Sequence, residues 1–518
     1  MSRTGQAAVA ARPARAAGLL LHPTSLPGRF PIGDLGPSAV TMLDWMVSAG
    51  FTVWQVLPLG PTGMGDSPYN ALSAFAGNPL LISPEALVAD GLLSPEALPA
   101  WTVQESASVD FAAAAACKES LLRQAFLRFE SGEFTEVAAG LERFADRERR
   151  AAWLDDWALY SSLKREHGGA SWLDWEPRLR QREPQALGRK AAALAGEIRY
   201  AIFCQFLFFR QWAAVRGAAE SRGIRILGDV PIYVAPDSAD AWANSRLFDL
   251  DPDGGLRAVA GVPPDYFSAD GQRWGNPLYR WDLLRAEGFA WWIARLRSQL
   301  EIAHYLRLDH FRGFVAYWRI PHRHTTARRG KWVKGPGEAF FQAVRQGLGS
   351  LPLLVEDLGE IDARVHDLRR RLDLPGMRVL QFGFGVADSD HSPHRHEPRS
   401  AVYTGTHDND TTRGWFATAG DEERRRVLTY LGATPETVTA AMIRAAYGSV
   451  AELAILPLQD VLDLGSEARM NTPGRQSGNW SWRVRHADVA ADLPGRMRDL
   501  AAATARLPAP PTLPPEGA

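Results

Sequence analysis

The chain has 518 residues, which exceeds one ordinary domain but suits a barrel of roughly 250 residues that carries insertions. Hydrophobic residues make up 46% of the chain and charged residues 23%, so a large buried core is possible and general disorder is excluded. The 58 basic and 59 acidic side chains nearly cancel, which argues against a nucleic-acid partner bound through clustered Lys and Arg.

Cysteine usage and the length of the apolar runs indicate a cytoplasmic protein. The two cysteines, Cys117 and Cys204, have no metal-ligand spacing, and Cys204 lies in an apolar stretch typical of a buried thiol. Few cysteines in a long chain fit the reducing cytosol. The N-terminal segment lacks the apolar core of a signal peptide, and no apolar run reaches the roughly 20 residues that span a bilayer. We therefore expect a cytoplasmic location and no membrane partner.

Eight short apolar runs that each break off at polar residues predict the strands of one buried sheet. In chain order they are residues 18–27, 52–61, 224–234, 305–313, 352–359, 377–384, 401–409 and 453–462. Near-continuous apolar strands are typical of a parallel sheet covered on both faces, and helix-like segments separate them here. The pattern predicts an α/β fold, a (β/α)8 barrel. The alternative, an open doubly wound sheet, lacks its Gly-rich first turn.

The uneven spacing of the runs predicts insertions in a barrel domain that covers residues 18–500. About 165 residues separate the second run from the third, and helical patterns within them predict a mainly helical subdomain over about 85–200. A stretch rich in Pro, Gly, Asp and Trp predicts an irregular insertion over about 235–281. We expect disordered tails at 1–17 and, because of its Pro content, at 501–518.

Three of the predicted strands, the fourth, fifth and seventh, end in acids: Asp309, Glu356 and Asp408. Barrel active sites lie at the C-terminal strand ends, so the three acids can converge. Glycoside chemistry needs one charged carboxylate and one protonated carboxylic acid. Arg307 lies on the same side of its strand as Asp309 and would keep that carboxylate ionised. Glu356 follows an apolar run, which favours the raised pKa of a general acid.

Other interpretations of these residues stay open at this point. Each acid alone is equally compatible with a buried ion pair or a strand-end turn, and three acids together could bind a divalent metal. The stretch containing His391, His394 and His396 raises the question of zinc. It lacks a matching Cys or a helical His pair, so a polar loop is the preferred interpretation.

Nine stretches carry the most specific pattern in the chain. They are "GLLLHPTSLPGRFPIGDLG", "WQVLPLGPTGMGDSPYNALSAFAGNPLLI", "GDVPIYVAPDSADAW", "VAGVPPDYFSADGQRWGNPLY", "RLDHFRGF", "KWVKGPGEAFF", "VEDLG", "YTGTHDNDTTRGW" and "RMNTPGRQSGNWSWR". Together they extend over roughly residues 18 to 485. They resemble, in the family's own order, the 4-α-glucanotransferases (amylomaltases or disproportionating enzymes) of glycoside hydrolase family 77.

The resemblance implies a (β/α)8 barrel with inserted subdomains and no C-terminal β-sandwich. It also implies a retaining reaction without cofactor or metal, in which the enzyme cleaves an α-1,4-glucan. The donor part is held covalently and passed to the 4-hydroxyl of glucose or another glucan. The implied partners are thus an α-1,4-glucan donor and a glucose or maltooligosaccharide acceptor.

The resemblance also implies residue roles, by matching motifs. Asp309 matches the nucleophile, Glu356 the general acid/base, and Asp408 the third acid, which binds donor hydroxyls and stabilises the transition state. Tyr69 matches a tyrosine linked to a secondary glucan-binding site, and Trp274 with Gln272 matches the loop that covers the glucan. The full set of substrate-binding matches is Tyr69, Asp229, Gln272, Trp274, Arg307, His310, Asp357, His407 and Asn471.

Departures from the family pattern leave the three acids intact but bear on specificity. Asn70 and Ala71 replace a more usual Gln-Ser pair, and Arg319 and His324 stand where acidic residues are expected. The carboxylates alone do not separate a transferase from an α-amylase-type hydrolase, since both form the same covalent intermediate. A non-catalytic glucan-binding protein is the less favoured third hypothesis, because all three acids are present.

Overall fold

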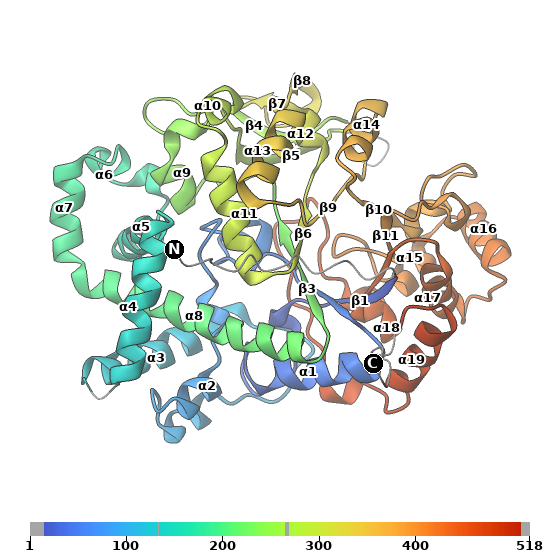
Figure 1. The fold of residues 1–518 in the computed structure, drawn as a ribbon, viewed down its shortest axis with the longest axis horizontal. Coiled ribbons are helices and arrows are strands. Elements are labelled where there is room, and N and C mark those ends of the chain that lie inside the picture. Colours follow the sequence, from blue (N-terminus) through green and yellow to red (C-terminus); the bar gives the residue numbers. More distant parts are fainter. Residues whose placement is uncertain (1–14, 133, 265–268, 509–518) are drawn as a thin grey trace, which may run out of the picture.

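Eight parallel strands form the central sheet of the computed structural model, which describes residues 15–132, 134–264 and 269–508 (Figure 1). The order of neighbours is β10-β11-β12-β1-β2-β3-β6-β9. At its two edges, the backbone N–H of Val355 donates to the carbonyl of Pro375 at 2.9 Å, so β9 and the start of β10 meet and the sheet nearly closes. The strands are β1 (Ala16–Leu20), β2 (Val53–Gln55), β3 (Arg225–Val230), β6 (Tyr305–Leu308), β9 (Leu353–Val355), β10 (Gly376–Val379), β11 (Ser400–Tyr403) and β12 (Leu453–Pro457).

The predicted (β/α)8 barrel is therefore confirmed, with every predicted run supplying one strand. Burial on both faces explains the continuous apolar runs: all residues of β1, β2, β9, β10 and β11 are buried. Helices cover the outside, as in Figure 1. They are α1 (Pro37–Ser48), α8 (Ala195–Ser221), α11 (Ala290–Ile302), α13 (Glu338–Leu348), α14 (Ala363–Arg371), α15 (Thr412–Thr418), α16 (Asp421–Leu431), α17 (Val438–Gly448) and α19 (Leu493–Ala503).

The long connection between β2 and β3 consists mainly of helices, which occupy one side of the molecule in Figure 1. The first long helix starts at a clear signal, because the Asp110 side chain accepts a hydrogen bond from the backbone N–H of Ala113 at 2.9 Å. The helices that precede α8 are α2 (Pro84–Ala89), α3 (Phe111–Glu130), α4 (Thr135–Arg150), α5 (Leu154–Glu166), α6 (Pro177–Arg180) and α7 (Pro184–Ala193).

A second, antiparallel sheet lies beyond the C-terminal ends of the barrel strands, at the top of Figure 1. Its order is β5-β4-β7-β8. The segment 235–281, expected to be irregular, supplies two of its strands, and the loop after β6 supplies the other two. Regular pairing with a distant hairpin explains why the first segment lacked a clear local strand pattern. The strands are β4 (Ala258–Val262), β5 (Gln272–Pro277), β7 (Ala316–Pro321) and β8 (Lys331–Lys334).

The expected tails are shorter than predicted where the structure describes them. Residues 16 and 17 already belong to β1, and α19 continues to Ala503. Beyond it the buried Arg506 donates to the carbonyls of Ala16 and Ser449 at 3.0 and 2.9 Å, which ties the C-terminal segment to the bottom of the barrel. The remaining parts of both expected tails, 1–14 and 509–518, lie outside the described residues.

No single helix in the described ranges has the length and apolar character needed to cross a membrane. One bent pair, α7 together with α8, meets that criterion when the two helices are joined across an 81° bend.

Candidate active site

The three predicted acids lie at the C-terminal ends of their strands. Asp309 follows β6 directly, Glu356 follows β9 directly, and Asp408 lies in the loop after β11. Strands β6 and β9 are hydrogen-bonded neighbours. The backbone N–H of His310, next to Asp309, donates to a carboxylate oxygen of Glu356 at 2.8 Å. The first two acids are thus held side by side at one edge of the barrel mouth.

Arg307 holds the carboxylate of Asp309 from within the barrel. Its Nη1 lies 2.8 Å from Oδ1 of Asp309 and 2.9 Å from both carboxylate oxygens of Asp229. Burial alone would lower the pKa of Arg307, but the two aspartates reverse this and hold its pKa well above the ordinary value. The Asp309 side chain is 27% exposed, whereas that of Asp229 is fully buried. Asp309 is therefore an accessible carboxylate beside a permanent positive charge.

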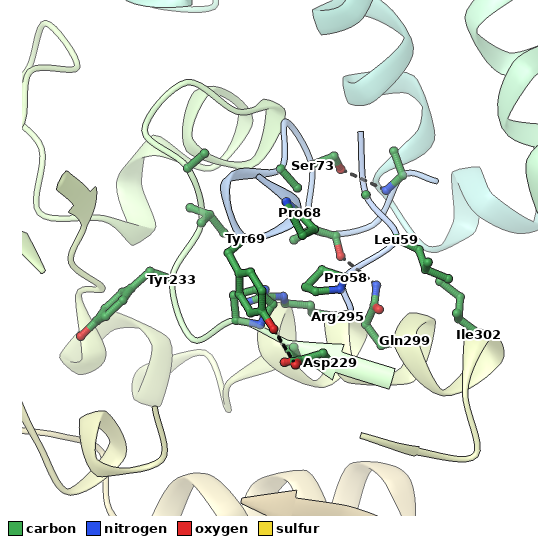
Figure 2. Close-up of a pocket in the computed structure, with 18 residues that line it drawn as sticks. Pro58, Leu59, Pro68, Tyr69, Ser73, Asp229, Tyr233, Arg295, Gln299 and Ile302 are labelled. Carbon is green, nitrogen blue, oxygen red and sulfur yellow. Dashed lines mark hydrogen bonds between the residues drawn. The ribbon is translucent and has the colours of Figure 1, made fainter. Parts of the chain in front are cut away.

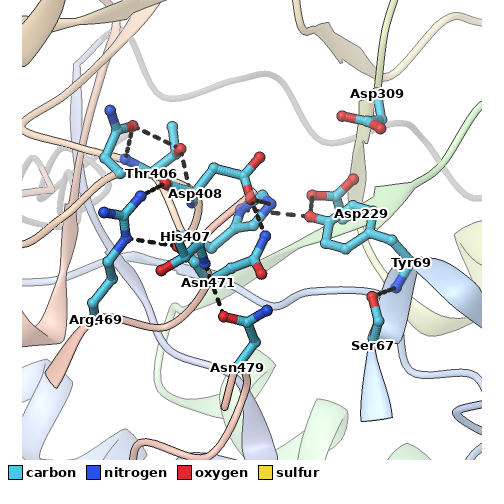
Figure 3. A network of polar contacts seen from close by, with 12 residues as sticks. Ser67, Tyr69, Asp229, Asp309, Thr406, His407, Asp408, Arg469, Asn471 and Asn479 are labelled. Atoms are coloured by element: carbon cyan, nitrogen blue, oxygen red, sulfur yellow. Dashed lines mark hydrogen bonds and ion pairs between the residues drawn. The ribbon is translucent and has the colours of Figure 1, made fainter. Parts of the chain in front are cut away.

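Asp229 and Tyr69 form the inner wall of the site. The Tyr69 hydroxyl donates to Oδ2 of Asp229 at 2.8 Å, and its ring stacks on His407 with 4.8 Å between centroids (Figure 3). Tyr69 and Asp229 also line the cavity between the end of β3 and residues 58–76 (Figure 2). These contacts place Tyr69 at the same centre as Arg307, whereas its motif match links it to a secondary glucan-binding site.

Glu356 is surrounded so that its protonated form is favoured. Burial raises its pKa to about 8, and the negative charge of Asp309 contributes further. Two backbone N–H groups, of His310 and Leu358, orient the carboxyl group at 2.8 and 2.7 Å. His310 has a left-handed backbone with φ of 50°, which is rare for a non-glycine residue and turns its N–H toward Glu356. Glu356 is thus suited to donate a proton at neutral pH.

Asp408 differs from the other two acids because its side chain is 48% exposed. Asn471 donates to its Oδ1 at 2.6 Å, and Nε2 of His407 lies 3.4 Å from the same oxygen. The backbone around it is fixed as well, since Arg469 donates to the Asp408 carbonyl and the Asn471 N–H donates to the His407 carbonyl (Figure 3). Asp408 is a fixed, solvent-facing acceptor opposite Asp309.

Trp274 and Gln272 project from β5 of the second sheet over the catalytic centre. The edge of the Trp274 ring contacts the His310 ring at 4.8 Å between centroids, and its Nε1 donates to Oε1 of Gln272 at 3.1 Å. Burial lowers the pKa of His310 to about 4, so its imidazole is neutral. Trp274 is 37% exposed, a large apolar surface that a ligand can cover.

Asp357 does not join the other predicted ligand residues. Its carboxylate is fully buried 3.3 Å from Arg369 and 3.6 Å from Arg378, and it accepts the backbone N–H of Met377 at 2.7 Å. Successive side chains at a strand end point to opposite sides, so Asp357 turns outward where Glu356 turns inward. The predicted substrate contact of Asp357 is therefore corrected to a structural ion pair behind the site.

Two residues of the site escaped the sequence analysis. His22, two residues after the end of β1, is buried next to His407, and burial together with the charge of His407 lowers its pKa to about 3. Trp480 places its ring 5.9 Å from those of both Tyr69 and His407. His22 ends an apolar run just as Asp309 does, and that signal would have found it. Trp480 lies in an irregular segment that has no periodic pattern.

The predicted histidine-rich stretch does not form a metal site in the part of the chain described. His391 accepts the backbone N–H of Val379, His396 bonds the Ser449 hydroxyl at 2.7 Å, and His394 contacts Tyr430. The three imidazoles thus contact different parts of the protein and do not converge on one point. Among the described residues, no group of three or more His, Cys, Asp or Glu side chains could hold a metal ion.

A (β/α)8 barrel that presents an arginine-paired carboxylate beside a protonated carboxylic acid belongs to the class of enzymes that act on glycosidic bonds. Comparison with known proteins narrows this class. A family described as 4-alpha-glucanotransferase matches residues 21–488. The chain therefore belongs to the 4-α-glucanotransferase family, and it is an enzyme.

Individual relatives agree with this assignment over almost the whole chain. The 4-alpha-glucanotransferase of Thermus thermophilus is 50% identical over 502 residues, which covers 95% of this chain and 99% of the relative. The chloroplastic/amyloplastic enzyme of Solanum tuberosum is 44% identical over 502 residues, with 95% and 87% covered. The amylomaltase of Streptococcus agalactiae, solved in complex with acarbose, superposes with a TM-score of 0.92 at 36% identity, with 95% of this chain and 100% of that one covered.

Proposed function

We propose that this chain transfers a segment of an α-1,4-glucan to the 4-hydroxyl of glucose or another glucan by retaining double displacement. The observation that carries the proposal is the pairing of Asp309, which lies 2.8 Å from Nη1 of Arg307, with Glu356, whose pKa is raised to about 8. Neighbouring strands lie about 4.8 Å apart, which suits the roughly 5 Å carboxyl separation of retaining enzymes better than the wider inverting spacing.

In the first step the Asp309 carboxylate attacks the anomeric carbon of the donor sugar. The bond to the glycosidic oxygen breaks as Glu356 delivers its proton to that oxygen, so the shortened glucan leaves as an alcohol. The donor segment remains as a glycosyl ester of Asp309. Arg307 supports this step because its ion pair with Asp309 orients the attacking carboxylate.

In the second step Glu356, now a carboxylate, removes the proton from the 4-hydroxyl of the acceptor. That oxygen attacks the anomeric carbon, the ester bond to Asp309 breaks, and the carboxylate is regenerated. Two inversions give net retention. Asp408, fixed by Asn471, accepts hydrogen bonds from donor hydroxyls and stabilises the positive charge that develops on the sugar ring.

Transfer rather than hydrolysis requires that a sugar hydroxyl, not water, reaches the intermediate. Trp274 extends from β5 over His310 and would cover a bound glucan, which excludes water from the ester. The binding partners that follow are an α-1,4-glucan donor and a glucose or maltooligosaccharide acceptor. A cytoplasmic location belongs to the same proposal and is supported by the low cysteine content.

Maltotriose disproportionation tests the reaction. Purified protein should convert maltotriose into a ladder of longer maltooligosaccharides plus free glucose. Chain shortening without elongation would instead identify a hydrolase, and unchanged maltotriose with retained glucan binding would identify a non-catalytic binding protein.

An α-maltosyl fluoride donor, whose leaving group needs no proton, distinguishes the role of the nucleophile from that of the general acid. Glu356→Gln should lose maltotriose turnover but still release fluoride as the ester forms. Asp309→Asn should release none, because it lacks the nucleophile. Equal fluoride release by the two variants would contradict the assigned roles.

A further inference from the structure

The hairpin β7–β8, which follows the nucleophile strand β6, is cationic throughout. Residues 316–334 contain six Lys and Arg side chains and no Asp or Glu, in a chain whose formal net charge is −1. Two of the six have carboxylate partners: Arg319 pairs with Asp249 at 3.1 Å and Arg328 with Asp270 at 2.6 Å. The other four, Arg323, Arg329, Lys331 and Lys334, lie within 4 Å of no carboxylate in the described ranges and are exposed.

Two of these cations face each other directly across the hairpin. In the antiparallel register of β7 and β8, Arg319 stands opposite Lys331. Like charges directly opposite each other destabilise a sheet, and only Arg319 has a compensating acid. By this rule the two side chains repel each other, and an anionic ligand between them would relieve the repulsion.

The face of the sheet that carries this pair is continuous with the cover of the catalytic centre. Ala260 of β4 stands opposite Arg319, and Val262, two residues further on the same face, stands opposite Gln272 of β5. Trp274 is two residues from Gln272 and so shares this face, as their hydrogen bond also requires. From Gln272 to the Arg319 and Lys331 strands the distance is about 10 to 15 Å, at roughly 4.8 Å per strand.

We propose that this face, defined by Gln272, Trp274, Arg319 and Lys331, is an extended binding surface for α-glucan chains that carry phosphate monoesters. The inference rests on the proposed function, because the glucan chain is what connects the catalytic centre with the hairpin. A chain of several glucose units held under Trp274 would continue over the sheet and bring its phosphate groups between Arg319 and Lys331. Lys331 is exposed and has no carboxylate within 4 Å in the described ranges, and Arg319 beside it is paired with Asp249 alone, so the two cations together attract phosphate through Coulomb and hydrogen-bond interactions.

Binding measurements with one glucan in two charge states test the proposal. The probes are a maltodextrin that carries phosphate monoesters and the same preparation after treatment with phosphatase, titrated calorimetrically into the protein. At low ionic strength the phosphorylated probe should bind about tenfold more tightly, a preference that should vanish near 1 M salt, where the Debye length is about 3 Å. Equal dissociation constants for the two probes at low salt would overturn the proposal.

Charge variants of the hairpin locate the effect. Lys331→Glu combined with Arg323→Glu should abolish the tenfold preference, and Lys331→Gln should reduce it without introducing a negative charge. Arg444→Glu, which changes an exposed arginine on α17 away from this sheet, is the matched control and should keep the full preference. Thermal unfolding shows whether each variant folds. An unchanged preference in folded Lys331→Gln and in the folded double variant would exclude this face as the binding surface.

Two further outcomes distinguish the possible failures. The first is competition by a polyphosphate that contains no glucose units. If it displaces the phosphorylated probe as effectively as unlabelled phosphorylated maltodextrin does, the hairpin is a general anion-binding surface, which contradicts a glucan site. Maltotriose that stays unconverted by the wild-type protein would overturn the proposed function, whereas conversion together with equal binding of both probes would overturn only the present inference.

Discussion

Nη1 of Arg307 lies 2.8 Å from Oδ1 of Asp309, and the same nitrogen lies 2.9 Å from both carboxylate oxygens of Asp229. One buried guanidinium therefore pairs with a partly exposed carboxylate, that of Asp309, and with a buried one, that of Asp229. The buried carboxylate fixes the arginine, and the arginine fixes the exposed carboxylate at the position where a nucleophile is needed. Asp309 is thus both one partner of an ion pair and the proposed nucleophile.

Replacement of Arg307 should affect catalysis and folding together. Arg307→Lys keeps the charge but loses the planar guanidinium, and we expect kcat/KM to fall about 10- to 100-fold. Arg307→Gln leaves Asp229 buried without its cation, and the free energy of unfolding should fall by about 3 kcal/mol. Steady-state kinetics and urea unfolding measure the two effects. A Gln variant with wild-type stability would contradict the burial argument.

The raised pKa of Glu356 predicts the alkaline limit of activity. The first step needs a protonated Glu356, so kcat/KM should decline as the pH rises through about 8. Stability, like activity, should fall as the pH rises. The folded state holds this proton between the ordinary pKa of 4.5 and about 8, whereas the unfolded state loses it at 4.5. The stability contribution is therefore complete below pH 4.5 and is lost as the pH rises through 8.

Glu356→Gln provides the control, because glutamine does not titrate. The difference in melting temperature between this variant and the wild type should shift in favour of the variant as the pH increases from 4.5 to 8. A pH-independent difference would mean that Glu356 titrates in the folded protein as it does in the unfolded chain.

The barrel and its acids could be predicted from the sequence because a buried parallel strand has a local sequence pattern, an apolar run that ends in a polar residue. Asp309 and Glu356 follow such runs directly. The second sheet could not be predicted in this way, since β4 pairs with β7, more than 50 residues later, and its strand "AVAGV" carries no alternation of polar and apolar residues. The outward turn of Asp357, by contrast, could have been predicted, because side chains alternate along a strand and Glu356 next to it faces inward.

Tyr69→Phe isolates one hydrogen bond at the inner wall. The variant loses the donor to Asp229 but keeps the ring stacked on His407. Loss of a hydrogen bond to a charged group costs about 1.5–3 kcal/mol, so kcat/KM should fall by roughly 10- to 100-fold. The measurement is maltotriose kinetics at neutral pH. Tyr69→Ala, which also removes the stacked ring, should be worse, and equal effects in both variants would mean that the hydroxyl alone matters.

Asp357→Asn tests whether this carboxylate is a structural ion-pair partner and not a substrate ligand. The change leaves Arg378 buried without its carboxylate, whereas Arg369 keeps its ion pair with Glu397 at 2.8 Å, and we expect the free energy of unfolding to fall by about 3 kcal/mol. Because the side chain is fully buried behind the site, the KM for maltotriose should stay close to the wild-type value at temperatures where the variant is folded. A selective rise in KM at unchanged stability would restore a direct role in substrate binding.

Trp274→Ala should change the fate of the glycosyl intermediate more than the rate at which it forms. The side chain covers His310 beside the nucleophile, and its removal admits water to the Asp309 ester. We expect the ratio of hydrolysis to transfer to rise severalfold, measured as newly formed reducing ends relative to elongated products from maltotriose. Fluoride release from α-maltosyl fluoride, which reports the first step, should fall less than transfer does. Tyr430→Ala, which removes an exposed aromatic ring from α16, is the control and should leave the ratio unchanged. An unaltered ratio in Trp274→Ala would mean that other residues exclude water from the site.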